Sequence, residues 1–193
     1  MIDVLSALRR CLPWLTLSAL LATPAAGGDA LQGKVVEVIR GDIIIVEDVA
    51  RTRHTVRLAG IDAPDLKQAF GKESRKGLAD LLLGRRIAVE RRKQDNYGRI
   101  VGRVAVAPAG CATCPPTRDA ALAQLEAGLA WWFRDERREQ PLEEQGYYEY
   151  AEFDARTRRL GLWQDAAPVP PWQWRKRENK PYITLLVIHR ASA

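Results

Sequence analysis

The stretch Arg57-Leu58-Ala59-Gly60-Ile61-Asp62-Ala63-Pro64-Asp65 lies where a strand pattern gives way to a turn that carries two carboxylates. The residues before it alternate, and Val56 and Leu58 fall on one face of a strand predicted over residues 52–58. A glycine and a proline inside the stretch then punctuate the chain, as is typical of a turn. The stretch therefore predicts a strand that ends at an edge of a sheet and delivers both aspartates there.

The residues before this stretch predict a β-hairpin. β-branched side chains dominate residues 35–39 and 43–46, and the turn Arg40-Gly41-Asp42 separates the two runs. Together with the strand over residues 52–58, they predict a meander of three strands.

The residues after the stretch predict a helix and then two further strands. Leucines recur at helical spacing within residues 72–83, and Gly84 follows at the position of a helix end. Strands are predicted over residues 87–91 and 100–106, and the turn over residues 95–98 joins them.

Two more helices are predicted in the C-terminal half. Thr117 is expected to cap a helix whose leucine stripe runs to Leu129, and Pro141 to open a third helix that ends near Gly161. Five strands with a helix between the third and the fourth are the layout of an OB-fold barrel. We therefore expect an α+β, mainly β domain: a five-stranded OB-fold barrel with three α-helices.

The N-terminal residues 1–28 have the pattern of a secretory signal peptide. Two arginines precede a short apolar run, and small residues follow it. The run is short for a membrane span, so we expect export to the periplasm or the medium, without stable membrane insertion after processing. The alternative is an uncleaved segment that anchors the protein to a membrane. The folded domain is expected over residues 29–164. A C-terminal extension over residues 165–193 would cover the barrel, bind a partner or stay loose.

Length and charge bound the kind of protein. The 193 residues are enough for one domain with a substantial core. A formal net charge of +6 suits a polyanionic partner such as nucleic acid. We expect a monomer.

Cys111 and Cys114 lie in a loop rich in proline and glycine. In an oxidising compartment, a small disulfide loop is the expected state. A zinc site would need two further ligands, and His54 and His189 show no matching spacing.

Chemistry-bearing side chains fall at the predicted strand ends. Asp42, Asp62 and Asp65 would bring three carboxylates to one rim of a small barrel, and Arg57 and Arg99 would bring two guanidiniums. Carboxylates with a backbone carbonyl form a hard oxygen site for Ca²⁺ or Mg²⁺. Guanidiniums bind phosphoryl oxygens, and a further carboxylate can orient or deprotonate a water molecule. The set suits metal-assisted cleavage of a phosphodiester.

Each of these residues also has an ordinary structural explanation. Asp42 fits a hairpin turn. Asp62 fits a turn into a helix, and Asp65 fits a negative charge near a helix N-terminus. The two arginines fit solvated strand positions, so spacing alone leaves both interpretations open.

Several segments resemble the thermonuclease family, whose type member is staphylococcal nuclease. They cover roughly residues 32–164 in the family's order and spacing, and are residues 35–42, the stretch 57–65, residues 95–99, 127–131 and 155–163. The resemblance implies an OB-fold barrel with three helices. It also implies calcium-dependent hydrolysis of DNA and RNA, in which the 5′ O–P bond is cut and 3′-phosphate ends are left.

The resemblance also implies roles for individual residues. Asp42 and Asp62 would be carboxylate ligands of Ca²⁺, with Mg²⁺ as the alternative ion, and the carbonyl of Ala63 would lie beside them. Arg57 and Arg99 would hold the scissile phosphate.

The remaining implied roles concern water and substrate. Asp65 falls where the family has a glutamate thought to be the general base, and Tyr97 falls where the family has a tyrosine that contacts a nucleotide phosphate. Trp131 and Trp132 lie where base-stacking aromatics are expected, and stacking would suit DNA or RNA that is single-stranded or open. The alternative for the two tryptophans is packing within the domain.

Three positions depart from the family. Arg40 replaces an aspartate near the metal, Ile43 replaces a threonine whose hydroxyl can support the site, and Asp65 is one methylene shorter than glutamate. Two hypotheses follow: a working metal-dependent nuclease with reduced activity, or a nuclease-fold module that binds nucleic acid or a protein partner without catalysis.

Overall fold

The computed structural model describes residues 30–111 and 113–178. The predicted signal peptide, residues 1–28, and the last 15 residues of the predicted extension, 179–193, lie outside the described residues. Within the described ranges, no helix has the length and apolar content needed to cross a membrane.

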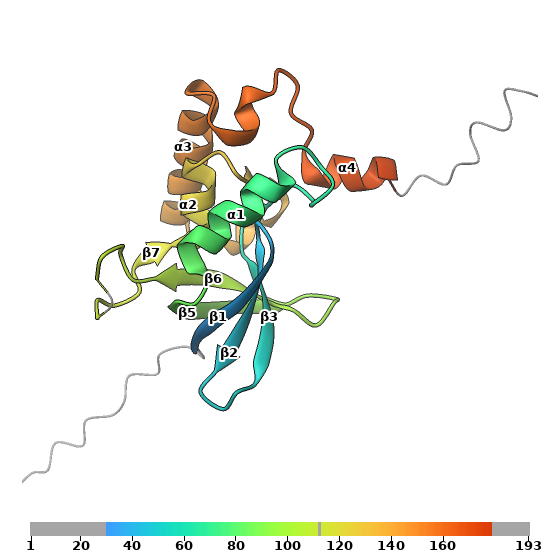
Figure 1. Cartoon of the computed structure of the whole chain (residues 1–193). Helices are drawn as coiled ribbons and strands as arrows, with labels where there is room; N and C mark the ends of the chain where they lie inside the picture. Colours follow the sequence, from blue (N-terminus) through green and yellow to red (C-terminus); the bar gives the residue numbers. More distant parts are fainter. Residues whose placement is uncertain (1–29, 112, 179–193) are drawn as a thin grey trace, which may run out of the picture.

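Five strands form a closed barrel. They are β1 (Ala30–Arg40), β2 (Ile43–Asp48), β3 (Arg53–Leu58), β5 (Arg86–Gln94) and β6 (Ile100–Val106). Neighbours in the order β3-β2-β1-β5-β6 are antiparallel, and a parallel pairing of β3 with β6 closes the barrel. The expected five-stranded OB-fold barrel is therefore confirmed (Figure 1).

Three two-residue strands lie outside the barrel. They are β4 (Ile61–Asp62), β7 (Arg118–Asp119) and β8 (Trp131–Trp132). β7 extends the sheet beside β6, whereas β4 pairs only with β8, which places Asp62 opposite Trp131.

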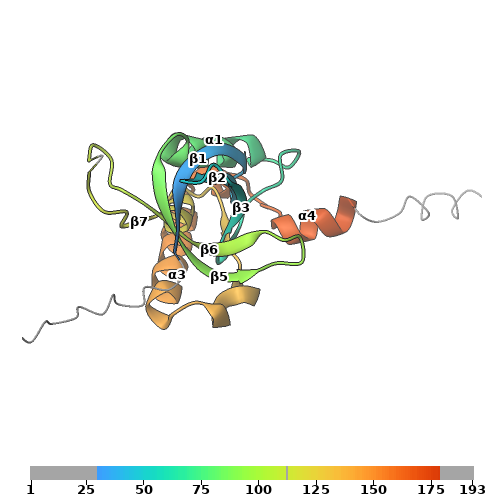
Figure 2. The same ribbon diagram turned by 90° about the horizontal axis from the view of Figure 1, so that it is seen from below.

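The helices are α1 (Gly71–Leu82), α2 (Ala120–Glu126), α3 (Leu142–Thr157) and α4 (Pro171–Glu178), with the 3₁₀ turns η1 (Arg134–Glu139) and η2 (Gly161–Gln164). The first three are the predicted helices, and Pro141 stands at the N-cap of α3 as expected. α4 was not predicted, because residues 165–193 carry no clear helical period. Figures 1 and 2 show α4 and the β5–β6 hairpin projecting at the same side of the molecule.

The predicted start of α2 was wrong. The side chain of Asp119, not Thr117, accepts the hydrogen bonds of the first turn, from the amides of Ala121 at 2.8 Å and Leu122 at 3.1 Å. A carboxylate at the N-cap accepts hydrogen bonds from two otherwise unpaired amides at once. The N-cap is therefore Asp119, two residues after the predicted Thr117. Leu129 lies beyond the end of α2.

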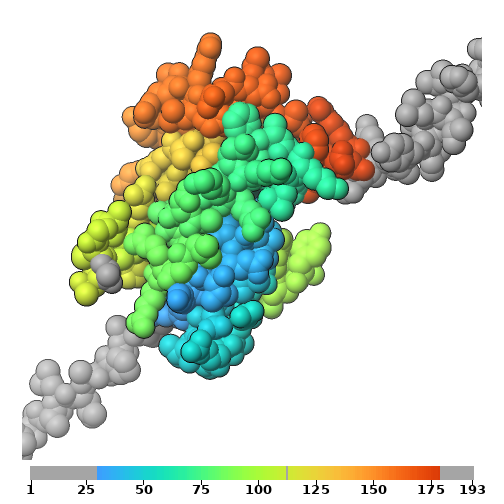
Figure 3. Space-filling model, in the orientation of Figure 1, coloured from blue at the N-terminus to red at the C-terminus, as the bar shows by residue number. Residues whose placement is uncertain are grey.

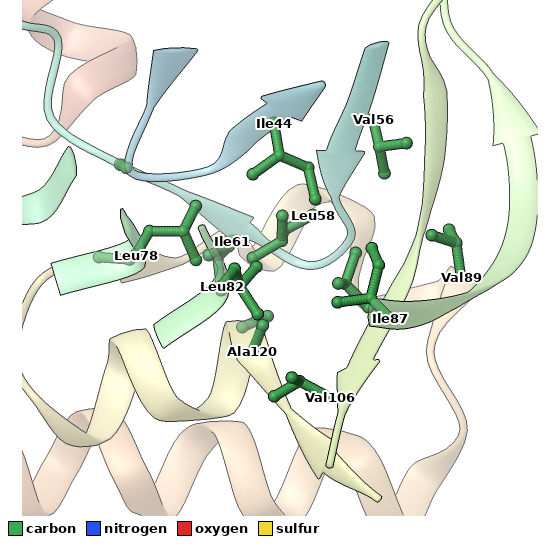
Figure 4. Packing of buried hydrophobic residues seen from close by; sticks show 14 of the residues in the cluster. Ile44, Val56, Leu58, Ile61, Leu78, Leu82, Ile87, Val89, Val106 and Ala120 are labelled. Atoms are coloured by element: carbon green, nitrogen blue, oxygen red, sulfur yellow. The ribbon is translucent and has the colours of Figure 1, made fainter. Parts of the chain in front are cut away.

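The core fills the barrel and the space beneath α1 and α2 (Figure 4). Its largest buried aliphatic side chains come from strands and helices alike: Ile44, Leu58, Ile61, Leu78, Leu82 and Leu125. Burying each such side chain stabilises the fold by roughly 1.5–3 kcal/mol. The core also packs close to the turn between β1 and β2, whereas the turn between β2 and β3 is exposed.

Candidate active site

The turn between β1 and β2 is fixed by close contact with α1 and α2. A side chain on Gly41 would place its Cβ 1.8 Å from the hydroxyl oxygen of Ser74, so only glycine fits there. Gln124 donates a 2.8 Å hydrogen bond to the carbonyl of Gly41, and the amide of Leu58 donates one of 2.8 Å to the carbonyl of Asp42. The turn therefore holds the Asp42 carboxylate in one place, fully buried.

Asp62 and Asp65 reach the same place from β4 and the loop after it. Asp62 is buried, and Asp65 is about a quarter exposed, with a side-chain exposure of 25%. Gln68 closes this loop, because its amide donates to the carbonyl of Asp65 at 2.8 Å. Ala63 is fully buried and lies against Gly41, so the loop and the β1–β2 turn pack together.

A single guanidinium contacts all three carboxylates. Arg40 binds Asp42 through two parallel 2.8 Å hydrogen bonds, pairs with Asp65 at short range and lies 3.6 Å from Asp62. Burial acts to lower the pKa of Arg40, but the hydrogen bond and charge of Asp42, with the charges of Asp65 and Asp62, raise it overall. Arg40 therefore points inward and stays charged.

A second guanidinium arrives from α4. Arg175 binds both oxygens of Asp62, at 2.5 Å and 3.2 Å, and lies 3.3 Å from Asp65. Burial raises the pKa of Asp62, and the negative charge of Asp42 raises it further, whereas Arg175 and Arg40 oppose the shift. Sequence reasoning missed this residue, and its only signal was the basic run Arg175-Lys176-Arg177 in the extension.

The carboxylates suit a hard divalent cation in chemistry. Three carboxylates that touch one guanidinium carry oxygen ligands of the kind that Ca²⁺ and Mg²⁺ take. Within the described residues, no three acidic, histidine or cysteine side chains gather their ligand atoms as closely as a bound metal requires. The carboxylate oxygens instead pair with the guanidiniums of Arg40 and Arg175. Their chemistry therefore suits a metal cation, and in this structure two arginines supply the positive charge.

Arg57 and Arg99 form a basic side of the same site. Arg57 donates to both carboxylate oxygens of Glu136, at 3.0 and 3.1 Å, and to the carbonyl of Ile61 at 3.2 Å. Burial acts to raise the pKa of Glu136, but the charge and hydrogen bond of Arg57, together with Lys93, lower it overall. Glu136 was missed as well, because nothing in its sequence neighbourhood points to β3.

The predicted turn over residues 95–98 presents Arg99. Asp95 accepts hydrogen bonds from the backbone amides of Tyr97 and Arg99 and from the Arg99 side chain, the last at 2.7 Å. Gly98 has φ of +75°, which favours glycine. Tyr97 is 84% exposed, and its ring lies 5.0 Å from the guanidinium of Arg99.

One open pocket connects the acidic and basic sides. Its lining includes four arginines, Arg40, Arg57, Arg99 and Arg175, beside Asp62, Tyr97, Phe133 and Glu136. The predicted Asp42, Asp65 and Ala63 lie directly behind it, through the contacts of Arg40 and the packing of Ala63 on Gly41.

Trp131 and Trp132 are turned inward. They are adjacent on β8, so their rings point to opposite faces, and both faces are covered. Trp132 belongs to the barrel core and donates to Gln140 at 2.8 Å, whereas Trp131 packs on Trp163, 4.4 Å away between ring centroids. Their burial, 8% and 4% exposed, favours packing over base stacking.

Cys111 and Cys114 lie in the loop between β6 and β7 and are not among the residues that line this pocket. The two residues are joined by a disulfide, with their Cα atoms 5.4 Å apart.

A small OB-fold barrel that gathers buried carboxylates and arginines at one rim has the features of a phosphodiester hydrolase. Residues 55–165 match the family described as staphylococcal nuclease homologue, and the chain belongs to this family.

Individual relatives point the same way. The chain is 41% identical over 150 residues to a micrococcal nuclease of Shigella flexneri, which covers 75% of this chain and 80% of that protein. It is 36% identical over 148 residues to an uncharacterized endonuclease of Escherichia coli, covering 77% and 87% of the two chains. It is also 36% identical over 175 residues to the Escherichia coli protein ParB, covering 89% and 96%. The chain is therefore a nuclease that binds nucleic acid, and its family suggests dependence on a metal ion.

Proposed function

We propose that this nuclease hydrolyses phosphodiester bonds in DNA and RNA with Ca²⁺ as its metal, and leaves 3′-phosphate ends. The observation that carries the proposal is one pocket lined by Asp62, Arg57 and Arg99, with Asp42 and Asp65 joined to Asp62 behind it through their shared contacts with Arg40. Such a pocket offers ligands for a cation and donors for a phosphate within a single cleft.

Asp42 and Asp62, with the carbonyl of Ala63, would hold the cation. Its contribution is to offset negative charge on a phosphodiester oxygen. The burial of Asp42 and Asp62 supports this role, because buried carboxylates are weakly solvated and bind a cation firmly.

Arg57 and Arg99 would bind the scissile phosphate. Glu136 and Asp95 fix the two side chains from behind, which reduces the ordering that substrate binding must supply. Guanidiniums held in this way stabilise the charge that develops on the phosphoryl oxygens as the bond breaks.

Asp65 would accept a proton from the attacking water. The water oxygen bonds to phosphorus, the P–O5′ bond breaks with its electron pair left on the 5′ oxygen, and that oxygen takes a proton from solvent to become the 5′-hydroxyl. Asp65 is the most exposed of the three carboxylates, which supports contact with water.

The substrate would be single-stranded or open. Tyr97 and Phe133 both line the pocket: the Tyr97 ring is exposed, whereas the half-buried Phe133 ring is partly covered by Trp172, so Tyr97 rather than the buried tryptophans is the aromatic surface available to bases. The signal-like pattern of residues 1–28 supports the further proposal that the protein is exported. We also propose that it acts as a monomer.

A second candidate function is a nucleic-acid-binding module with little or no catalysis. Arg40 favours it, because its inward guanidinium hydrogen-bonds to Asp42 and Asp65 and forms an ion pair with Asp62, so it pairs with all three carboxylates. The shorter Asp65 favours it too.

Analysis of product ends tests the proposal. A defined single-stranded oligodeoxynucleotide and its RNA counterpart would be incubated with the purified protein and Ca²⁺, and the fragments weighed by mass spectrometry. The proposal predicts fragments ending in 3′-phosphate and 5′-hydroxyl. Fragments with 5′-phosphate ends would reject the proposed bond cleavage, and binding without fragments would favour the second candidate.

A further inference from the structure

α4 is attached to the domain by apolar contacts near its start and by the ion pairs of Arg175 further along the helix. Gln68 donates a 2.6 Å hydrogen bond to the carbonyl of Val169, just before the helix. The ring of Trp172 lies 5.8 Å from Trp131 and 5.5 Å from Phe133 between centroids. Figure 3 shows α4 lying against the segment that joins β4 to α1.

Arg175 covers the carboxylates from the solvent side. Its side chain is 38% exposed, whereas that of Asp62 beneath it is 3% exposed. Arg40 approaches the same carboxylates from β1 and is 17% exposed. Arg40 is held in a barrel strand, whereas Arg175 belongs to an eight-residue helix that forms no part of the barrel and packs on the cluster of Trp131 and Trp163 through Trp172.

The charges set up a competition. With both arginines in place, the three carboxylates keep one negative charge in excess. A divalent cation added to that arrangement would leave an excess of positive charge in a partly buried cluster. Exchange of Arg175 for the cation leaves the cluster neutral, and it also frees both oxygens of Asp62.

We propose that Arg175 is an internal competitor of the metal ion: α4 covers the carboxylates of Asp62 and Asp65, and a divalent cation binds as the helix leaves. The inference rests on the proposed function, since it takes these carboxylates as the metal ligands. Release of α4 also uncovers Phe133, so metal binding and opening of the aromatic surface are linked.

Calcium binding by the full chain tests this inference. Isothermal titration calorimetry with CaCl₂ would compare the wild type with Arg175→Gln, and with Arg177→Gln as a control that removes the same charge from an exposed position on α4. Trp172→Ala would loosen the helix and keep the charge of Arg175. Hydrogen exchange of residues 171–178 would be followed in the wild type with and without Ca²⁺.

We expect Arg175→Gln to bind Ca²⁺ at least about tenfold more tightly. The metal ion then no longer has to displace a charge-assisted hydrogen-bonded pair, and the loss of such a competitor lowers the dissociation constant by about tenfold or more. Trp172→Ala should also bind more tightly, and Arg177→Gln should match the wild type. Ca²⁺ should speed exchange in α4.

The inference is overturned if Arg175→Gln binds no more tightly than Arg177→Gln, or if saturating Ca²⁺ leaves exchange in α4 unchanged. Absence of Ca²⁺ binding in every variant overturns it as well. Tighter binding by Arg175→Gln without cleavage of single-stranded DNA would reject the nuclease mechanism and keep this inference. Cleavage of single-stranded DNA together with an unchanged Ca²⁺ affinity of Arg175→Gln would keep the nuclease mechanism and reject this inference.

Discussion

The acidic and basic sides of the pocket are built from the same barrel but are held differently. Asp42 and Asp62 are buried and Asp65 is a quarter exposed, and guanidiniums cover the three from both the barrel and the C-terminal extension. Arg57 and Arg99 are held from behind by single carboxylates and line the open pocket.

This difference separates two requirements of the reaction. The basic side already lines the pocket with oriented guanidiniums, and 11% of the Arg57 side chain and 24% of the Arg99 side chain are exposed there. The acidic side is paired with two arginines of its own chain, and by our proposal a metal ion binds there only after it replaces Arg175. Regulation of the enzyme therefore belongs to the acidic side, and recognition of the substrate belongs to the basic side.

The largest expected effect concerns Arg40, which pairs with the carboxylates of the acidic side from the barrel. Arg40→Gln leaves the fully buried Asp42 without its guanidinium, and breaking such a pair costs about 3–5 kcal/mol of unfolding free energy. Urea denaturation measures it, and Ca²⁺ should restore part of the loss. Arg53→Gln, which removes an exposed arginine 3.5 Å from Glu47, should cost less than about 1 kcal/mol. Equal, small losses in both variants would show that Arg40 is not needed to hold the acidic side.

The next effect concerns the basic side alone. Arg57→Ala should lower kcat by about 10²–10³-fold, because a guanidinium aimed at the developing charge is removed. Initial rates on single-stranded DNA measure the loss. Arg51→Ala, at an exposed turn between β2 and β3, is the control and should keep the wild-type rate. An Arg57→Ala enzyme with more than a tenth of the wild-type kcat would remove Arg57 from the mechanism.

Asp65 is the most exposed carboxylate of the acidic side, with 25% of its side chain exposed. Asp65→Glu lengthens the side chain by one methylene and should raise the cleavage rate by up to about tenfold. A base displaced by about an ångström lowers the rate by this factor or more, and the longer side chain would reverse that displacement. Rates would be compared with Asp80→Glu, an exposed position on α1. A tenfold fall in rate for Asp65→Glu, with no change for Asp80→Glu, would contradict this expectation and show that the site needs the shorter aspartate.

The smallest effect concerns the support of Arg57. Glu136→Gln should lower kcat about fivefold with little change in KM, because a charged hydrogen bond of roughly 1 kcal/mol that orients Arg57 is lost. Glu139→Gln, whose carboxylate reaches Lys93 but not Arg57, is the matched control. Equal rates in the two variants would assign Glu136 a structural part only.

The pH dependence of this support has a definite sign. The folded protein lowers the pKa of Glu136 below its ordinary value of 4.5, so its ionised form favours folding. That stabilisation is complete above the ordinary value and is lost as the pH falls through the folded value. A carboxyl resonance of Glu136 should therefore titrate below pH 4.5 in the wild type. Titration at or above the ordinary value would contradict the ion pair with Arg57.

The barrel could be predicted because its strands follow local rules. The β-branched runs over residues 35–39 and 43–46 became β1 and β2, with the turn at Gly41 between them. The stretch from Arg57 to Asp65 carried the family resemblance, and the family is confirmed.

The partners of the site residues could not be predicted in the same way. Arg175 lies 113 positions after Asp62, and Glu136 lies 79 positions after Arg57, so only the closed fold brings them together. The orientation of Trp131 and Trp132 depends on β8 having protein on both faces, which a two-residue strand does not reveal.

The most direct test of the account is the rate at which the wild-type protein cleaves single-stranded DNA in Ca²⁺ and after chelation, with Arg57→Ala measured beside it. The account predicts cleavage that depends on Ca²⁺ in the wild type, is abolished by the chelator and is at least about 10²-fold slower in Arg57→Ala. Cleavage that persists under chelation, or that Arg57→Ala performs at the wild-type rate, would contradict it.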